Sequence, residues 1–501
     1  MRRYPAGSYF QTHSPAGKRI TVMGLGLNGG GEEAVRFFLK RGAFVTATDL
    51  KSEAELAKTV RALKDDPALD AARLRFALGR HELADFADAD AVIKNPAVKY
   101  EGNRFLAAAR TVESDLSTFL ALSASPIIAV SGSKGKSTTA SAIHYGLCRA
   151  GFTAFLGGNI TVSPLSFLEQ TTVRTPVVLE LSSWQLADLA GRGILRPRVA
   201  VITPIMRDHQ NWYGSMKSYV ADKKVIYAGQ DASAWTICAA RDPWGDEFAA
   251  ETPARALRYG AAPLPAGSFG AWLEPDGTGM IRLPDMREPA VAVDALLVPG
   301  RHNRLNVLNA ALALAALGVP PETCRTVFAE WRGIPHRLEY FREWQPAPDC
   351  AVRFYNDTAA TVPEAAAVAV QAFGKPVHLI AGGTDKSLDF APFADALKAP
   401  GAAFPAASIC LLAGNGTDKL IPLLDERGVA YEGPYDSLEG LLCALRTRLL
   451  RRFSAARQNG ETDAQEIVVF SPGATSFGMF QNEFDRGERF KKAVAEIFRE
   501  R

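Results

Sequence analysis

The sequence predicts an α/β protein of three domains, and three observations support this prediction. The chain has 501 residues, which is about three domains at roughly 150 residues each. Short apolar runs alternate with helical patterns along most of it, as in parallel sheets with crossover helices. Two runs break into glycine turns that open a helix, at residues 24–29 and 132–135. Turns of this kind bind phosphate groups, because backbone N–H groups and a helix N-terminus face the anion.

Composition excludes several classes of protein. The formal charge of +3 is too small for a nucleic-acid-binding surface. We expect no signal peptide, and the most apolar helical stretch, residues 307–319, is too short to span a bilayer. The six cysteines form no C-x-x-C pair, so neither a zinc site nor a disulfide framework is indicated. We therefore expect a cytoplasmic monomer whose partners are small molecules, with no nucleic acid and no membrane.

The first predicted domain, residues 1–122, is Rossmann-like. A strand at Arg19–Met23 leads into the pattern G-x-G-x-x-G, followed by a helical pattern. A second strand at residues 44–48 ends at Asp49, and an acidic residue about twenty positions after the glycines is typical of dinucleotide-binding turns. A nucleotide-sugar diphosphate can use the same turn, so this pattern alone leaves both ligands open.

The second glycine turn is the most informative motif of the chain. It follows the apolar run at residues 127–130 and precedes a helical pattern at 139–149. Lys136 is expected to reach the outer phosphates of ATP, and the Ser137 hydroxyl to bind Mg²⁺. An ordinary glycine turn is the alternative. The residues predicted to contact ATP in this loop are Gly132, Ser133, Lys134, Gly135, Lys136, Ser137 and Thr138.

The rest of the chain divides into a P-loop ATPase-like central domain, residues 123–331, and a Rossmann-like third domain, residues 332–501. In the central domain, we expect strands at 177–181 and 199–203, a small β-rich excursion at 252–298, and a helix from His302 to about Gly318. In the third, four apolar runs separated by helical patterns predict a second parallel sheet. These runs are residues 352–355, 377–381, 409–412 and 467–470.

The form of the phosphate loop is unusual. Two residues separate its first glycine from the Gly-Lys pair, where the common Walker pattern has four. This shortened loop resembles that of the Mur ligases and their folylpolyglutamate synthetase relatives, which form amide bonds with ATP. Residues 180–186 read E-L-S-S-W-Q-L and closely resemble the D-glutamate-adding Mur ligases. The resemblance spans nearly the whole chain and implies an ATP-dependent acid–amino-acid ligase of peptidoglycan precursor synthesis.

The resemblance implies that the first domain binds the UDP group of UDP-N-acetylmuramoyl-L-alanine, with Asp49 near the uridine. The implied contacts of this substrate are Gly24, Gly26, Leu27, Asn28, Gly29, Asp49 and Ser182. Glu180 ends a strand-like run beside the phosphate loop, where its carboxylate would be a hard oxygen ligand for Mg²⁺. A solvated loop glutamate is the alternative at that position.

Two further implied metal ligands lie in the central domain. By alignment of motifs, His209 would bind a second Mg²⁺ and Lys223 would carry a carbamate that helps to hold it, while Lys224 is the alternative alignment. Asn211 departs from the family pattern Asp-His-x-Asp. The implied metal set is Ser137, Glu180, His209 and carbamylated Lys223, with two ions beside ATP, and the implied catalytic set is Lys136, Glu180, His209 and Lys223.

Three further motifs are implied to serve ATP. Asn303 and Asn306 are three residues apart, so they share one helix face, and they would hold the nucleotide. Capping of the helix by Asn303 is a compatible alternative. Arg337, in Pro-His-Arg, would contact phosphate, and Asp357, in Asn-Asp, would orient the nucleotide or its metal.

The third domain is implied to bind the incoming amino acid. Lys386 would pair with a substrate carboxylate, Ser476 would donate a hydrogen bond to it, and Thr361 is a third implied contact. The chain departs from the family around this pocket: Ala359 replaces a lysine, Gly478 an aspartate, and Glu483 an aromatic residue beside Phe484. The acceptor therefore stays open between D-glutamate and another amino acid such as L-glutamate.

The implied reaction transfers the γ-phosphoryl group of ATP to a carboxylate, and the acyl phosphate is then attacked by the amine of the amino acid. Two alternatives of other classes stay open. A nicotinamide-dependent oxidoreductase would explain the N-terminal glycines but not the phosphate loop. A non-catalytic ATP-binding relative would not require Lys136, Glu180 or Lys223.

Overall fold

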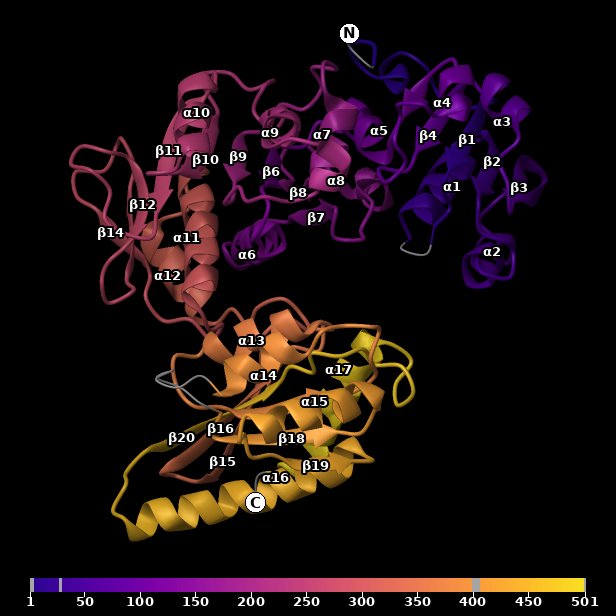
Figure 1. Cartoon of the computed structure of the whole chain (residues 1–501). Coiled ribbons are helices and arrows are strands. Elements are labelled where there is room, and N and C mark those ends of the chain that lie inside the picture. The colour runs from indigo at the N-terminus through magenta and orange to yellow at the C-terminus, as the bar shows by residue number, and fades with distance from the viewer. Residues whose placement is uncertain (1–3, 27–28, 399–405, 500–501) are drawn as a thin grey trace. The chain divides into compact units, whose positions relative to one another are not determined.

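The protein is described from a computed structural model, in which residues 4–26, 29–398 and 406–499 are placed well enough to describe. The chain divides into two compact units (Figure 1). One comprises Met1–Asp294 and Leu305–Phe328, and the other Ala295–Arg304 and Ala329–Arg501. The predicted α/β class is confirmed, and the described strands form three sheets. The predicted domain boundaries after residues 122 and 331 stay a prediction.

The first sheet has five parallel strands in the order β3-β2-β1-β4-β5. Its central strand is β1, whose residues after Arg19 are all buried. The glycine turn follows this strand. The strand order reverses between β1 and β4, and ligands of open α/β sheets bind outside the carboxyl ends of strands at such a point. The elements are β1 Arg19–Met23, α1 Gly30–Lys40, β2 Phe44–Asp49, α2 Ala57–Lys64, β3 Leu74–Leu78, α3 Leu83–Ala87, β4 Ala91–Lys94, α4 Arg104–Ala108, β5 Val112–Glu113 and α5 Asp115–Leu122.

The second sheet has nine strands in the order β14-β13-β12-β11-β10-β9-β6-β8-β7. The Pro- and Gly-rich stretch that we predicted to be a small excursion forms β11 to β14, which extend this sheet at one edge. The strands are β6 Ile127–Ser131, β7 Phe155–Gly158, β8 Val177–Glu180, β9 Val199–Ile202, β10 Trp235–Ala239, β11 Arg255–Gly260, β12 Gly270–Leu273, β13 Gly279–Arg282 and β14 Ala290–Val293. The helices are α6 Lys136–Arg149, α7 Ser183–Leu189, α8 Gln210–Tyr213, α9 Met216–Lys224, α10 Pro243–Glu251, α11 Arg301–Ala316 and α12 Pro321–Ala329.

The third sheet has six strands in the order β15-β16-β20-β17-β18-β19. All four predicted strands are present, but the prediction of a wholly parallel sheet is wrong at one edge. β15 pairs antiparallel with β16, because only a tight turn joins them and a parallel pair needs a long crossover. The elements are β15 Glu339–Ala347, β16 Cys350–Asn356, α13 Pro363–Gln371, β17 His378–Gly382, α14 Ala391–Lys398, β18 Ser408–Leu412, α15 Asn415–Glu426, β19 Glu432–Tyr435, α16 Leu438–Gln458, β20 Ala464–Phe470 and α17 Glu483–Ile497.

The helices near the predicted site differ slightly from expectation. α6 begins at Lys136, three residues before the predicted start, because the Gly-Lys-Ser-Thr segment itself forms the first turn. α11 begins at Arg301, so Asn303 lies inside the helix, and its predicted role as the cap is wrong. Within the described part of the chain, no helix combines the length and apolar character that a membrane crossing requires.

Candidate active site

The phosphate loop is packed so tightly that two of its positions accept only glycine. Gly132 has φ +141°, and a Cβ there would lie 1.9 Å from Thr203 Oγ1 at the end of β9. Gly135 has φ +88°, and its Cβ would lie 2.4 Å from Asn306 Oδ1. The loop is therefore pressed against the second sheet on one side and α11 on the other, which places the predicted Asn306 beside the phosphate cradle.

Inside the loop, Ser133 is buried and its hydroxyl forms hydrogen bonds within the protein, while its predicted contact with ATP stays a prediction. Its hydroxyl accepts a hydrogen bond from the Met206 amide at 2.9 Å and lies 2.9 Å from the Tyr219 hydroxyl. The Lys136 ammonium donates to the Ser133 carbonyl at 3.1 Å, so it lies against the loop that it is predicted to serve. Ser137 and Thr138 are half-buried in the first turn of α6, whereas Lys134 is exposed.

Glu180 lies at the tip of β8, opposite Val130 of β6, as the sequence predicted. Its side chain is 1% exposed. One carboxylate oxygen, Oε1, accepts from Asn159 Nδ2 at 2.9 Å. The other, Oε2, is buried and receives no hydrogen bond from the described residues. Because a buried carboxylate oxygen is costly to leave unpaired, this atom is suited to a cation.

Lys223, on α9, is also buried beside the phosphate loop. Its ammonium donates to the Gly132 carbonyl at 2.8 Å and lies 4.7 Å from the centre of the Tyr219 ring. Burial and the charge of Lys136 lower the pKa of Lys223 to about 7. Lys224, the alternative alignment, is instead paired with Glu247 and Glu251. The structure therefore favours Lys223 as the lysine of the site.

His209 lies beside the first turn of α7, and it is the most exposed of the predicted metal ligands, with 45% of its side chain accessible. Its ring lies 5.1 Å from that of Trp184 and 6.4 Å from that of Tyr219. The backbone of His209 has φ +49°, a left-handed conformation that is uncommon for a residue other than glycine.

The predicted ligands were tested for their fit to Mg²⁺. Among residues 4–26, 29–398 and 406–499, no three His, Cys, Asp or Glu side chains form a group that could hold a metal ion. The unpaired Glu180 oxygen nevertheless fits a hard cation, and Ser137 adds a hydroxyl oxygen. The predicted residues thus fit a Mg²⁺ ion that takes its remaining oxygens from a nucleotide and a carbamate.

The glycine turn after β1 is held by the predicted acidic residue. Asp49 Oδ2 accepts from the Gly26 amide at 2.9 Å, and Oδ1 accepts from the Lys51 amide at 2.9 Å. Gly24 has φ +90°, and a Cβ there would lie 2.9 Å from Asn95 Cβ, in the loop after β4. Gly29 precedes the first turn of α1. The predicted contacts Leu27 and Asn28 lie outside the described residues.

Three other predicted contacts have protein partners. The Ser182 hydroxyl caps α7, where it accepts from the Gln185 amide at 3.2 Å. Asn303 Nδ2 donates to the Pro299 carbonyl at 2.8 Å. Asp357 is buried and accepts from the Leu338 amide at 3.0 Å and the Ser471 hydroxyl at 2.6 Å. Burial raises the pKa of Asp357 to about 7. Each of these groups therefore also fixes local structure.

The predicted acceptor residues surround the carboxyl ends of β17 and β20. Lys386 and Arg337 are exposed, Thr361 is half-buried, and Ser476 is buried. The loops that carry Lys386 and Ser476 are joined by an antiparallel bridge between Thr384 and Thr475. A cavity of about 260 Å³ lies between these loops, and Ser476 is among the residues that line it.

Sequence reasoning missed Arg486 on α17, which also lines this cavity. Its side chain is 1% exposed, and it donates to the carbonyls of Ala474 at 3.0 Å and Thr358 at 2.9 Å. Burial lowers the pKa of Arg486 to about 10. The guanidinium thus ties together the two loops that carry Thr361 and Ser476. Its position on the apolar face of α17, one turn before buried Phe490, was the available signal.

Comparison with known proteins shows which protein family the chain resembles. Residues 130–315 match the Mur ligase middle domain. The UDP-N-acetylmuramoylalanine–D-glutamate ligase of Treponema pallidum (strain Nichols) is 41% identical, over 96% of this chain and 98% of that protein. The enzyme of the same name from Borreliella afzelii (strain PKo) is 35% identical, over 94% of this chain and 96% of that protein. The chain belongs to the Mur ligase family.

Solved structures of Mur ligases share the fold. UDP-N-acetylmuramate-alanine ligase MurC of Thermotoga maritima aligns with a TM-score of 0.54 and 18% identity, covering 96% of this chain and 99% of that one. The MurF ligase of Thermotoga maritima, solved in complex with ADP, aligns with a TM-score of 0.51 and 15% identity, covering 99% of this chain and 98% of that one. At these identities the likeness concerns the fold alone.

Proposed function

We propose that this Mur ligase joins D-glutamate to UDP-N-acetylmuramoyl-L-alanine, with ATP as the energy source, in peptidoglycan precursor synthesis. The relatives in Treponema pallidum and Borreliella afzelii are named for this reaction. The observation that carries the proposal is the convergence of Glu180 and Lys223 on a glycine loop that opens a helix. We further propose that it acts as a monomer in the cytoplasm, where ATP and nucleotide sugars are present.

The donor substrate is proposed to lie at the carboxyl end of the first sheet. Gly24, Gly26 and Gly29 let the backbone approach the diphosphate, and the N-terminus of α1 faces its charge. One oxygen of Asp49 already holds the turn through the Gly26 amide, so the uridine would meet an oriented carboxylate. Ser182 would contribute from the start of α7.

The phosphate loop would perform the first chemical step. A carboxylate is a poor acyl donor because its leaving group would be oxide. Attack of the donor carboxylate on the γ-phosphorus of ATP breaks the bond to the bridging oxygen, forms an acyl phosphate and releases ADP. The Lys136 ammonium and the loop amides spread the charge that develops on the transferring oxygens. Asn303, Asn306, Arg337 and Asp357 are proposed to hold the rest of the nucleotide.

Ser137, Glu180, His209 and carbamylated Lys223 are proposed to hold two Mg²⁺ ions. Bound Mg²⁺ supplies positive charge to the phosphate oxygens. The lowered pKa of Lys223 supports the carbamate, because only the neutral amine adds to CO₂, with loss of one proton. Glu180 supplies the unpaired buried oxygen that such an ion requires.

The acceptor loops would perform the second step. Lys386 is proposed to pair with a glutamate carboxylate, while Ser476 and Thr361 hydrogen-bond it and Arg486 holds their loops in place. The glutamate amine attacks the acyl carbon, loses a proton, and expels phosphate from the tetrahedral intermediate. The amide bond of the product is then complete.

The deciding experiment measures phosphate release by the purified protein with ATP, Mg²⁺, UDP-N-acetylmuramoyl-L-alanine and each enantiomer of glutamate. We expect turnover with D-glutamate and only background with L-glutamate. Preferred use of L-glutamate would replace the proposal by the related ligase. Calorimetry provides a second check, because Gly26→Val should abolish binding of the UDP-sugar by blocking approach of the backbone. Tight NADH binding without UDP-sugar binding would instead support an oxidoreductase.

A further inference from the structure

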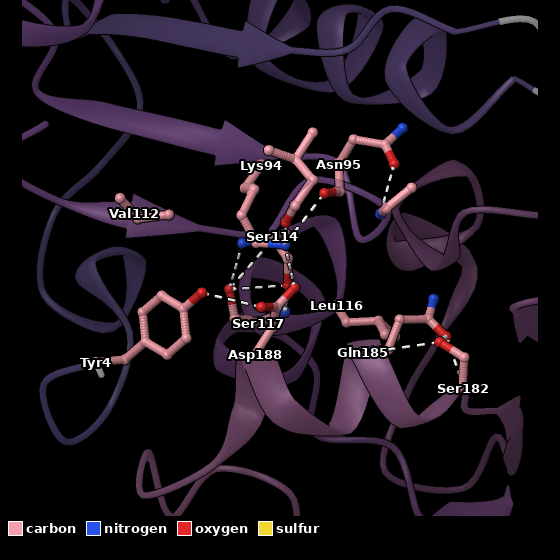
Figure 2. Close-up of polar contacts among 12 residues, drawn as sticks. Tyr4, Lys94, Asn95, Val112, Ser114, Leu116, Ser117, Ser182, Gln185 and Asp188 are labelled. Atoms are coloured by element: carbon pink, nitrogen blue, oxygen red, sulfur yellow. Dashed lines mark hydrogen bonds and ion pairs between the residues drawn. The ribbon is translucent and has the colours of Figure 1, made fainter. Parts of the chain in front are cut away.

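A buried lysine lies at the carboxyl end of β4, at the point where the strand order of the first sheet reverses. Lys94 is 3% exposed. Its ammonium donates to the carbonyls of Asn95 at 3.1 Å and Val98 at 3.0 Å, and so fixes the loop that follows the strand. It also forms an ion pair with Asp188 Oδ2 at 2.8 Å, as Figure 2 shows. One side chain thus joins this loop to α7 of the second sheet.

The ion pair is enclosed and has a third member. Asp188 is 6% exposed, and its other oxygen accepts from the Tyr4 hydroxyl at 2.9 Å (Figure 2). Burial raises the pKa of Asp188. Replacing a buried ion pair by apolar residues is often neutral for stability, so the stability of the fold does not by itself require these charges. Their geometry indicates a positioning role.

The two elements that Lys94 joins both border the proposed donor site. Asn95, the first residue of the loop, packs against Gly24 of the glycine turn. Asp188 lies on α7, which begins directly after Ser182 and follows the strand that ends at Glu180. The site must hold the UDP group at the first sheet and the reacting carboxylate at the second. The Lys94–Asp188 pair therefore lies between these two parts of the proposed site.

A second contact with the first sheet lies just beyond the C-terminal end of α7. The Arg192 guanidinium pairs with Glu113 at 3.1 Å and donates to the carbonyls of Val112 at 2.6 Å and Gly7 at 3.2 Å. The C-terminal end of α7 is thereby held to the first sheet twice, by Asp188 in its last turn and by Arg192 just after it. Beside the Lys94 pair lies a crevice of about 310 Å³, whose walls include Lys99, Trp184, Trp212 and Asp222. The crevice between the two sheets is thus bordered by the loop after β4 and by α7, which the two ion pairs hold together.

We propose that Lys94 is a positioning residue for the donor substrate, acting with Asp188 and Tyr4 to hold the loop after β4 at a fixed separation from α7, the helix that begins after Ser182. This inference rests on the proposed function, because it assigns a role within the UDP-sugar site. A shift of about 1 Å between two halves of a site can cost on the order of a hundredfold in rate. The substrate whose affinity depends on this separation is the UDP-sugar, which is proposed to contact both elements.

The test removes both charges of the ion pair and the Tyr4 hydroxyl together, so that neither Lys94 nor Asp188 is left without the other. In the variant Tyr4→Phe/Lys94→Met/Asp188→Leu, all three side chains keep similar volumes, so we expect a folded protein with a melting temperature close to that of the wild type. Without the ammonium, the Asn95–Val98 loop loses its anchor. We expect the KM and the calorimetric Kd for UDP-N-acetylmuramoyl-L-alanine to rise about tenfold or more, with an unchanged KM for ATP.

The matched control is Arg36→Met/Asp66→Asn, which removes a half-buried ion pair of the first sheet that holds no loop of the donor site. It should leave the affinity for the UDP-sugar unchanged. A folded triple variant with wild-type KM and Kd for the UDP-sugar would overturn the inference. If the wild-type protein itself failed to bind the UDP-sugar, the proposed function would be wrong instead.

A milder variant keeps the inference testable if the triple variant does not fold. Tyr4→Phe leaves both charges in place and removes one hydrogen bond from Asp188. We expect it to raise the KM for the UDP-sugar about threefold and to leave kcat and the KM for ATP unchanged. Equal changes in all three parameters would indicate a general structural role and would contradict positioning of the donor.

Discussion

The phosphate loop and the acceptor loops both follow parallel strands, but they are built differently. At the phosphate loop the charged groups Glu180 and Lys223 are buried, and Lys223 donates a hydrogen bond to the loop itself. At the acceptor loops the proposed recognition cation, Lys386, is exposed, and the buried cation, Arg486, is bound to backbone carbonyls. The comparison indicates that the groups proposed for phosphoryl transfer are held in place before substrate binds, whereas the cation proposed to recognise the amino acid is an exposed side chain.

The largest effect expected from this comparison is that of Lys136→Ala. Stabilisation of the transferring phosphoryl group dominates such reactions, so we expect kcat to fall by about a thousandfold or more in a folded protein. The fall in kcat is measured from the rate of phosphate release with all substrates present. Arg149→Ala is the control, since Arg149 is an exposed cation in the last turn of α6, away from the loop, and this variant should retain most activity. Near-normal turnover in Lys136→Ala would break the assignment of the phosphate site.

The tight packing of the phosphate loop predicts the next effect. Gly132→Ala would place a methyl group 1.9 Å from Thr203 Oγ1, at φ +141°. We expect the free energy of unfolding to fall by about 2–4 kcal/mol, and ATP binding to weaken with it. Gly151→Ala tests backbone strain alone, because Gly151 has φ +93° with no atom within 4 Å of the added Cβ. Equal losses in both variants, measured by denaturant unfolding, would contradict the packing argument.

Buried Asp357, which follows β16 in the same unit as the acceptor loops and is proposed to hold the nucleotide, predicts a pH dependence. Its pKa is raised from 3.8 to about 7 by burial, so the folded protein keeps a proton that the unfolded chain releases. The resulting stability is complete below pH 3.8 and is lost as the pH rises through about 7. We expect the free energy of unfolding to fall by about 2 kcal/mol between about pH 5 and 8, and Asp357→Asn to flatten this slope.

Asp349 supplies the control for that measurement. Its hydrogen bond with Arg457 lowers the pKa of Asp349 to about 2, so its titration falls below the measured range. Asp349→Asn should therefore preserve the slope between about pH 5 and 8. A slope that persists in Asp357→Asn would show that another group carries it.

The smallest expected effect sharpens the contrast between exposed and buried cations. Lys386→Ala should raise the KM for glutamate about fivefold, since a charge pair formed by an exposed lysine is worth about 1 kcal/mol. The KM values for ATP and the UDP-sugar should stay unchanged. Arg486→Lys is the comparison, because it keeps a charge but loses the fork that binds two carbonyls, and it should lower the melting temperature as well. An unchanged KM in Lys386→Ala would mean that the acceptor is held elsewhere.

The features that could be predicted from the sequence are those that depend on a short local pattern of residues. The phosphate loop and Glu180 could be placed because a glycine turn after an apolar run has one common geometry, and because a strand ends where its apolar run ends. The antiparallel β15 was missed, since its nine residues mix apolar and charged side chains. Lys94 was missed because its partner Asp188 comes from a distant segment. Arg486 was missed because a charged residue is expected to be exposed, and only its place on the apolar face of α17 indicated that it is buried.

The pairing of Lys94 with Asp188 has a consequence for the order of folding. During synthesis the first sheet leaves the ribosome before α7 exists, so Lys94 and Glu113 lack the partners Asp188 and Arg192. Burying a charge whose partner is missing costs about 3–5 kcal/mol, a large share of the stability of a small domain. The nascent first sheet therefore stays incompletely packed until the chain has grown past Arg192, and the two sheets then consolidate in one cooperative event.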